Sequence, residues 1–354
     1  MARVQAYCRE REIPFILVQT LGLCGRVFVD RGASFCYFHP GAGTLALRSG
    51  QHHTLSEFAQ LPLAERAALT EVIAEKPGQN ADCLQRIFKL MDSGIVDATR
   101  YKTPWNAKAA LDLFTQFGFS SPTAFQDDKY QHVASIFAGC AHFQFYPVNL
   151  AVGALGALEA LRVFDCRFGF SSRQQMIVDY TNVLPALPLE SEARPRGTRY
   201  DGLIALFGIG TANRLLNQKV AVVASTRVAE ELGKAVALCG SCSRTPLYLH
   251  ELVDATAQTK FSTVQELISR CNPSSQVERV NSEQLPAKLV PGMFVFMEKT
   301  DGEVEDLPRK DVRVIRIQVP ARELAMREID TALVCARAMS QYVQLALQPA
   351  PARK

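Results

Sequence analysis

The sequence has few features of a membrane protein or a nucleic-acid-binding protein. We expect no apolar run to reach the length of a membrane span. Residues 1–12 are charged and helix-forming, which is not typical of a signal peptide. The net charge of +4 is small and spread among both signs, so it does not indicate nucleic acid. The expected partners therefore include neither a membrane nor a nucleic acid.

Clustered cysteines are also scarce. The chain has 10 cysteines, mostly single and in apolar segments, such as Cys140, Cys166 and Cys335. Without a secretion signal this usage predicts reduced, buried thiols and a location in the cytoplasm or nucleus. Cys239 and Cys242 have the C-x-x-C spacing, but no second pair or histidine cluster accompanies them. We therefore predict a structural role for both and no metal site.

Glycine is missing from one turn where it would matter. Residues 220–238 have the apolar run of a buried strand, a short turn and a helix. In nucleotide-binding folds, glycines at such a turn let backbone N–H groups approach phosphates. Here Ala224, Arg227 and Ala229 stand in their place. Each Cβ narrows the approach, and Arg227 is expected to extend a long side chain into the turn. The frame favours a nucleotide-binding ancestry with the nucleotide lost; an ordinary strand, turn and helix remains the alternative.

The second half of the chain alternates strands with helices. Such alternation in a chain of 354 residues with 48% hydrophobic content predicts an α/β fold with a parallel sheet. The expected strands are residues 219–223, 247–249, 277–280, 294–297 and 312–319, and the expected helices are residues 200–216, 230–238, 261–271 and 322–347.

The first half has a different pattern. Short strands are expected at residues 13–18, 26–30 and 175–180, with loops around residues 41–50. The periodicity from residue 54 to about 141 predicts helices. A long apolar helix is expected at residues 146–164, where Gly153 and Gly156 would allow a close approach. Residues 187–198 combine prolines with mixed charges and are the best candidate for a linker.

Two segments of the second half carry a family resemblance. The first is Arg199-Tyr-Asp-Gly-Leu-Ile-Ala-Leu-Phe-Gly208, which precedes the strand, turn and helix. The second is Asn272-Pro273 before the third strand. Together they resemble the ThiF-type adenylation domains of ubiquitin and ubiquitin-like modifier activating enzymes. Lys234 and Gly240 stand at spacings that this family pattern predicts.

Two segments of the first half resemble the non-catalytic half of the same enzymes. Residues 8–30 are similar to a late strand and crossing loop. Residues 146–161 with 176–180 are similar to the helix and strand that close that half. The resemblance thus implies a Rossmann-like fold with a helical insertion at about 54–141. Residues 1–186 would be the C-terminal half of one ThiF-type domain, and residues 199–354 the N-terminal half of the next.

This order implies that neither half has a complete sheet of its own. An unpaired sheet edge along a half-domain would promote aggregation. We therefore expect either that the two halves complete each other as one circularly permuted domain, or that each needs strands from a partner chain or from residues outside this sequence.

The resemblance also implies a chemistry: adenylation of a modifier by ATP and magnesium, followed by thioester transfer to a cysteine. It places a degenerate nucleotide site at Ala224, Arg227, Ala229 and Lys234, with Glu251 as the acid for a ribose. Arg199 is a substitute for the family's arginine finger or, as the preferred interpretation, a partner in a surface salt bridge. No cysteine lies in a family thioester motif, so no catalytic residue is predicted.

The histidines and one acidic pair have simpler interpretations. His52 and His53 are expected to be solvated in a loop, and His132 and His142 to lie at the boundary of a core. Asp127 and Asp128 are expected to cap a helix rather than to act as an acid–base pair.

The predicted function is a non-catalytic, regulatory subunit or pseudo-enzyme of ubiquitin-like protein activation. Its expected partners are a catalytic subunit of an activating enzyme, as in a heterodimer, and a ubiquitin-like modifier. Two alternatives stay open: a divergent adenylating subunit that binds ATP and magnesium, and an interaction scaffold without nucleotide. Because the turn lacks glycine, we expect no cofactor.

Overall fold

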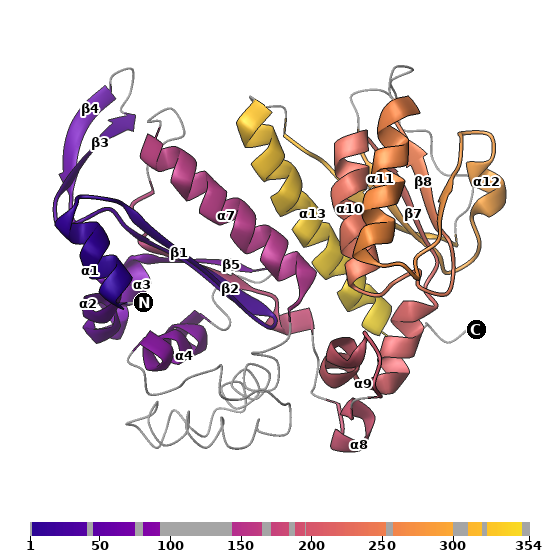
Figure 1. Ribbon diagram of the computed structural model, residues 1–354, viewed down its shortest axis with the longest axis horizontal. Coiled ribbons are helices and arrows are strands. Elements are labelled where there is room, and N and C mark those ends of the chain that lie inside the picture. The colour runs from indigo at the N-terminus through magenta and orange to yellow at the C-terminus, as the bar shows by residue number, and fades with distance from the viewer. Residues whose placement is uncertain are drawn as a thin grey trace. The chain divides into compact units, whose positions relative to one another are not determined.

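The computed structural model describes residues 2–40, 45–74, 81–92, 144–164, 171–183, 188–194, 196–252, 258–299, 311–320 and 324–348 (Figure 1). The chain forms two compact units. Unit 1 comprises Met1–Gln144 and Val152–Leu187, and unit 2 comprises Phe145–Ala151 and Pro188–Lys354. The predictions for Asp127, Asp128, His132 and His142, and for most of the helical insertion, lie outside the described residues.

Unit 2 contains a five-stranded sheet with the order β11-β10-β7-β8-β9. Every neighbouring pair is parallel, which confirms the predicted α/β fold. The chain begins in the middle of the sheet, moves outward through β8 and β9, and returns to β10 on the other side of β7. This is the doubly wound order of a Rossmann-like sheet. The strands are β7 (Val220–Ala224), β8 (Leu247–Glu251), β9 (Val277–Arg279), β10 (Phe294–Glu298) and β11 (Arg313–Ile317).

Helices cover both faces of this sheet. On one face α10 contacts both α11 and α13. Phe294 and Phe296 of β10 pack against Tyr342 of α13, with ring centroids 4.9 and 5.6 Å apart respectively. Since side chains alternate along a strand, the residues between them face the other side. The helices are α8 (Glu190–Ala193), α9 (Asp201–Leu216), α10 (Thr226–Leu238), α11 (Gln258–Cys271), α12 (Leu285–Lys288) and α13 (Leu324–Leu347).

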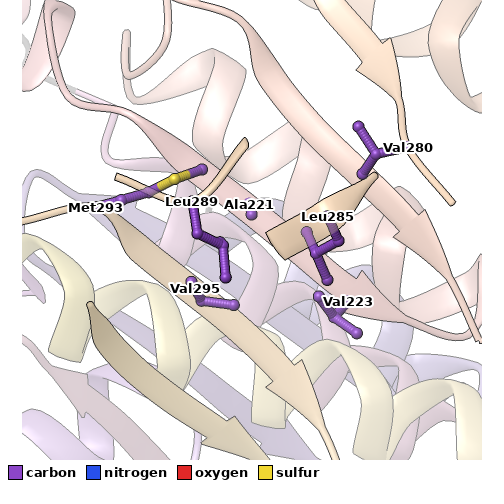
Figure 2. Close-up of a cluster of buried hydrophobic side chains, with 7 residues drawn as sticks. All are labelled: Ala221, Val223, Val280, Leu285, Leu289, Met293 and Val295. Atoms are coloured by element: carbon purple, nitrogen blue, oxygen red, sulfur yellow. The ribbon is translucent and has the colours of Figure 1, made fainter. Parts of the chain in front are cut away.

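The opposite face packs beneath the short helix α12. Figure 2 shows this cluster, in which Leu285 and Leu289 lie near alternate residues of β7 and β10. All seven members are nearly inaccessible to solvent: Ala221, Val223, Val280, Leu285, Leu289, Met293 and Val295. With both faces covered, the strands of this sheet are the near-continuous apolar runs that the sequence predicts.

Unit 1 contains a four-stranded sheet with the order β1-β2-β6-β5. Its β1–β2 and β2–β6 pairs are antiparallel, and β5–β6 is parallel. On one face Phe15, Leu17 and Phe28 pack with Leu55 and Phe58 of α2. The strands are β1 (Phe15–Leu21), β2 (Cys24–Asp30), β5 (Thr70–Ala74) and β6 (Gln175–Asp179). The helices are α1 (Ala2–Glu10), α2 (Leu55–Gln60), α3 (Leu63–Ala68), α4 (Ala81–Asp92) and the short 3₁₀ helix η5 (Thr181–Val183). Helix α7 (Tyr146–Phe164) belongs to unit 1 only from Val152 onward, and its first turns belong to unit 2.

Two elements of unit 1 differ from the sequence predictions. β5 lies inside the stretch predicted to be helical, because Val72 and Ile73 favour an extended chain that pairs with β6. β4 (Leu45–Gly50) is a strand where a loop was expected, and it pairs antiparallel with β3 (Phe35–Pro40), for which the sequence analysis made no prediction. β3, β4 and β5 are each stabilised by hydrogen bonds to a neighbouring strand. The local sequence pattern does not show that such a partner is present.

The two halves of the chain do not complete one common sheet. Among the described residues, the strands of unit 1 and those of unit 2 belong to separate sheets. The hypothesis of one circularly permuted domain is therefore wrong. Unit 2 reaches five parallel strands by itself, because β10 and β11 add on the far side of β7.

α7 is more apolar than the sequence analysis allowed. Among the described residues, α7 is long and apolar enough to cross a membrane, judged by length and composition alone. The expectation that no apolar run reaches the length of a membrane span is therefore wrong. Half of its most apolar window is buried within the structure. Its Glu159 is buried and pairs with Arg31 at 3.3 Å. A Cβ at Gly156 would lie 2.6 Å from Val18, whereas Gly153 has nothing within 4 Å. These contacts are typical of a helix in a protein core. The predicted close approach of another segment to α7 occurs at Gly156 and not at Gly153.

Candidate functional site

The candidate site of unit 2 lies at the carboxyl ends of β7 and β10. The strand order reverses between these two neighbours. In open α/β sheets, ligands bind in the crevice at such a switch point. The turn after β7 leads directly into α10, so the N-terminus of that helix points to the same place.

The turn itself has little room. Ala224 is the last residue of β7 and is 0% exposed, and its carbonyl accepts a hydrogen bond from the backbone N–H of Leu252. Ala229, one turn into α10, is also buried. The structure therefore brings together these two predicted site residues, but as packed side chains at the base of α10.

Arg227 has a partner outside the turn. Its Nη1 lies 2.5 Å from the Glu328 carboxylate of α13, and both side chains are about half exposed. The prediction that Arg227 extends into the turn is therefore wrong, because a neighbouring acid holds its guanidinium on the α13 side. A pair this exposed contributes little to stability.

Glu298 supplies a charge that the sequence analysis missed. It ends β10, is 6% exposed, and its Oε2 accepts a hydrogen bond of 2.6 Å from the backbone N–H of Ser225. Ser225 is the N-cap residue of α10, and its own side chain makes no capping hydrogen bond. The carboxylate thus lies at the positive end of the helix dipole, where a bound anion would also be favoured.

A signal for Glu298 was present in the sequence. It is the first acid after the apolar run Phe294–Met297, and residues that end the strands beside a switch point face the crevice. The sequence-based prediction places the acid at the end of the second strand, at Glu251. The acid that reaches the turn comes instead from the strand on the other side of β7.

Lys234 lies away from the turn. It is eight residues along α10 from Thr226, which corresponds to about 12 Å of helix. Its Nζ lies 2.6 Å from Glu231 and 3.6 Å from Glu230. Burial lowers its pKa, but the hydrogen bond and charge of Glu231 outweigh that effect and raise it overall. Lys234 is therefore held in a local ion cluster.

Glu251 ends β8, where its backbone pairs with Ala224. Its side chain lies outside the described part of the structure. The preceding residue, His250, is bound through Nδ1 to the carbonyl of Val280 at 3.0 Å.

The residues that carry the family resemblance in unit 2 connect helix ends. The Asp201 carboxylate accepts hydrogen bonds from the backbone N–H groups of Arg196, Gly197 and Thr198. The Arg199 guanidinium donates to the carbonyl of Cys271 at 2.9 Å. The expected surface salt bridge of Arg199 is therefore wrong, since its partner is the last carbonyl of α11.

Asn272 and Tyr200 extend this structural role. Asn272 is 0% exposed and donates from Nδ2 to the carbonyl of Ala237 at 3.0 Å and to Ser243 Oγ at 3.1 Å. Tyr200 Oη lies 2.8 Å from the same serine hydroxyl. These residues connect the ends of α10 and α11 at the edge of the sheet opposite to the candidate site.

His52 is not solvated as expected. It is 8% exposed, its Nδ1 accepts a hydrogen bond from the backbone N–H of Arg31, and its ring packs edge-on against Phe35. Burial lowers its pKa to about 4, and the nearby Arg31 charge adds to that shift. These contacts fix the loop that contains His52 against Arg31, which follows β2, and against Phe35 of β3. The neighbouring His53 is half-buried.

Cys239 and Cys242 are buried thiols. Their exposed fractions are 4% and 1%, and Cys242 Sγ lies 3.3 Å from the carbonyl of Gln218. Burial raises the pKa of each to about 12. Within the described ranges, no three His, Cys, Asp or Glu side chains come together as a metal site would require.

We expect these two thiols to resist alkylation. A pKa near 12 leaves about a thousandfold less thiolate than an ordinary thiol has, and the thiolate is the reactive species. Iodoacetamide pulses followed by mass spectrometry should therefore label exposed Cys36 and spare Cys239 and Cys242 until guanidinium chloride unfolds the chain. Equal labelling of all three in the folded protein would contradict this assignment.

Comparison with known proteins gives a partial and distant match. No protein-family model matches the chain. It is 29% identical over 163 residues to Ubiquitin-like modifier-activating enzyme 1 of Rattus norvegicus, covering 43% of this chain and 15% of that protein. It is 34% identical over 98 residues to Ubiquitin-like modifier-activating enzyme 7 of Homo sapiens, covering 27% and 10% respectively.

A third relative agrees with these two. The chain is 26% identical over 173 residues to Ubiquitin-like modifier-activating enzyme 7 of Mus musculus, covering 46% of this chain and 17% of that protein. The chain is thus a distant homologue, over part of its length, of ubiquitin-like modifier-activating enzymes. The matched segment spans less than a fifth of each relative.

Proposed function

We propose that this homologue of ubiquitin-like modifier-activating enzymes is a non-catalytic, regulatory subunit or pseudo-enzyme in ubiquitin-like protein activation. Its role is to support a catalytic partner that adenylates the modifier. The observation that carries the proposal is the Glu298 carboxylate at the N-terminus of α10, in a fold that otherwise has the strand order of a nucleotide-binding domain.

The residues of the turn fit the phosphates of ATP poorly. A phosphate favours a helix N-terminus because of its free N–H groups and positive dipole. Here the N–H of Ser225 already donates to a carboxylate, and that carboxylate would repel a phosphate. Ala224 and Ala229 add Cβ atoms where a backbone would need to approach closely. Charge and shape therefore both act against a nucleotide.

A second candidate function is a divergent adenylating subunit. The observation in its favour is the sheet of unit 2, which has five parallel strands and a reversal of strand order between β7 and β10. ATP could then bind through contacts that do not depend on glycine. Nucleotide binding separates the two candidates.

We expect the native chain to show no binding of ATP with Mg²⁺ in titration calorimetry. Glu298→Gln removes the charge and preserves the shape of the side chain, so a gain of binding in this variant would identify the carboxylate as the excluding group. Glu266→Gln is the matched control, because it removes an exposed acid of the same unit that pairs with Arg270 on α11 and not with a residue of the turn. Arg227→Gly, measured alongside, tests the turn itself.

Micromolar ATP binding by the native chain would overturn the proposal and favour an adenylating subunit. The supporting role is tested by reconstitution: ATP–pyrophosphate exchange by a catalytic activating-enzyme subunit, with and without this chain. Stimulation that survives in Arg227→Gly supports a regulatory subunit. No complex and no change in exchange would point to the third alternative, a scaffold that has left the pathway.

A further inference from the structure

A second concave site lies at the opposite edge of the unit 2 sheet. It is a cavity of about 410 Å³ formed by the end of α9, the beginnings of β10 and β11, and the end of α13. Strands β7 and β10 begin here and end at the switch point, so the two sites are separated by the length of the strands. The lining residues that carry the argument are Asn213, Arg214, Gln218, Phe294, Arg313 and Gln348.

Phe294 and Arg313 line the cavity, and contacts with α13 and with each other hold both side chains in place. Phe294 is 1% exposed, and its ring packs edge-on against Tyr342 with centroids 4.9 Å apart. The Arg313 guanidinium lies 5.3 Å from the Phe294 ring centroid. Its Nη1 donates to the carbonyl of Leu345 at 3.1 Å. Two contacts therefore hold the guanidinium in place, while its Nε and Nη2 are available for a ligand.

Hydrogen bonds also restrain two further side chains that line the cavity, Arg214 and Gln218. Arg214 donates from Nη2 to Thr211 Oγ1 at 3.1 Å, which leaves its other N–H groups unused. Gln218 Nε2 lies 3.2 Å from the carbonyl of Gly292 and thereby connects the loop after α9 to the loop before β10. Arg313 and Gln218 are thus positioned before any ligand arrives, which reduces the entropy cost of binding. Arg214 is exposed and is restrained only by its bond to Thr211.

The cavity has an excess of positive charge. Neither Arg214 nor Arg313 forms an ion pair with an acid in the part of the chain that the structure describes. The C-termini of α9 and α13 contribute about half a negative charge each. The two guanidinium groups carry two positive charges, so the net charge around the cavity is about one positive charge. A small anion of matching geometry would restore the balance.

From these features we infer that this cavity binds a carboxylate-bearing ligand, with Arg214 and Arg313 as its anchors. A guanidinium presents paired N–H groups that match the two oxygens of a carboxylate. The cavity volume lies in the range of about 300–1,000 Å³ for small-ligand sites. The side-chain amides of Asn213, Gln218 and Gln348 suit a peptide-like group beside that carboxylate. This site does not depend on the proposed function.

Three small probes separate the sources of such a carboxylate. N-acetyl-glutamate amide offers only a side-chain carboxylate, N-acetyl-glutamine offers only an α-carboxylate, and N-acetyl-glutamine amide offers neither. Binding is followed by calorimetry and by the Nε–Hε resonances of the arginines in nitrogen-15 spectra. We expect the first, the second or both to bind and shift the resonances of Arg214 and Arg313, and the neutral probe to be inert.

Substitutions then locate the site. Arg214→Gln and Arg313→Gln should each weaken binding by about tenfold or more, because each removes a charge-assisted hydrogen bond. Arg270→Gln is the control, since this exposed arginine lies on α11 and pairs with Glu266. If Arg313→Gln fails to fold, the exposed Arg214 still gives a readout. Equal binding of the neutral probe, no binding of either acid, or an unchanged affinity in Arg214→Gln would overturn the inference.

Discussion

Replacing Asp92 with alanine is expected to destabilise unit 1 by about 3–5 kcal/mol, because it leaves a buried charge without its partner. Asp92 is the last residue of α4, and Arg26 belongs to β2. The two side chains are 1% and 3% exposed. Arg26 binds both carboxylate oxygens, at 2.8 and 2.5 Å, and donates from Nε to Gln19. This geometry is the bidentate pairing that makes such bonds strong.

A second buried arginine increases the expected loss. Arg66 of α3 is 1% exposed, and its Nη2 donates to the carbonyl of Gln85. Burial lowers the pKa of Arg66 to about 10; the charge of Asp92 raises it, and that of Arg26 lowers it further. Without Asp92, two guanidinium groups would share one interior with no acid between them.

Urea unfolding followed by circular dichroism measures this effect. Glu10→Ala is the matched control, since Glu10 forms an exposed pair with Arg11 in the same unit and should cost less than about 1 kcal/mol. Arg26→Met combined with Asp92→Leu should recover much of the loss, because it removes both charges together. An Asp92→Ala protein as stable as the Glu10→Ala protein would show that the buried pair is unimportant.

Acidification is expected to weaken unit 1 through His52. Its pKa is about 4 in the folded protein, against 6.5 for the ordinary group, so the unfolded chain binds the proton more tightly. The stability that depends on neutral His52 is complete above pH 6.5 and is lost progressively as the pH falls from 6.5 to about 4. A difference of this size corresponds to about 3 kcal/mol.

The surroundings of His52 explain the direction. Burial is the largest cause, and Arg31 and Arg9 oppose a second positive charge, while Asp30 acts in the other direction. Protonation would also place a proton on Nδ1, which already accepts from the backbone N–H of Arg31. The folded state therefore keeps the ring neutral.

The test compares unfolding free energies between pH 7.5 and pH 4.5 for the native chain and His52→Asn. Asparagine retains an acceptor near Nδ1 and removes the titration, so the pH dependence should be smaller by roughly the amount above. His53→Asn is the control, since His53 contacts Gln174 through its backbone N–H and carbonyl rather than its ring. Identical pH profiles for all three proteins would rule out His52 as the source.

Much of the sheet of unit 2 could be predicted from the sequence. Its strands are buried on both faces, so they are short apolar runs between helical segments, and that signal is local. Each of the five expected strands lies within about two residues of an observed one. β5 and the β3–β4 hairpin were missed because each is stabilised by a partner strand rather than by its own pattern.

The candidate site, like the sheet, was predictable from the sequence only in part. The sequence alone determined that a strand, a turn and a helix occur at residues 220–238, and that the turn has no glycine. Tertiary structure decided which groups meet there. Glu298 is 73 residues from Ser225 along the chain, and Glu328 is farther still from Arg227. Only the return of β10 to the edge of β7, and of α13 to α10, brings these side chains together.

The partners of the buried charges in unit 1 also could not be predicted from the sequence. A residue's tendency to form a helix or a strand depends on its near neighbours and can be read from the sequence. The partner of a buried charge depends on how distant elements pack, as Arg26 and Asp92 show across 66 residues. The sequence by itself therefore determined the elements and the missing glycines. The tertiary structure decided the strand order, the acid at the helix N-terminus and the charge balance of each interior, because these arise from contacts between segments far apart in the chain.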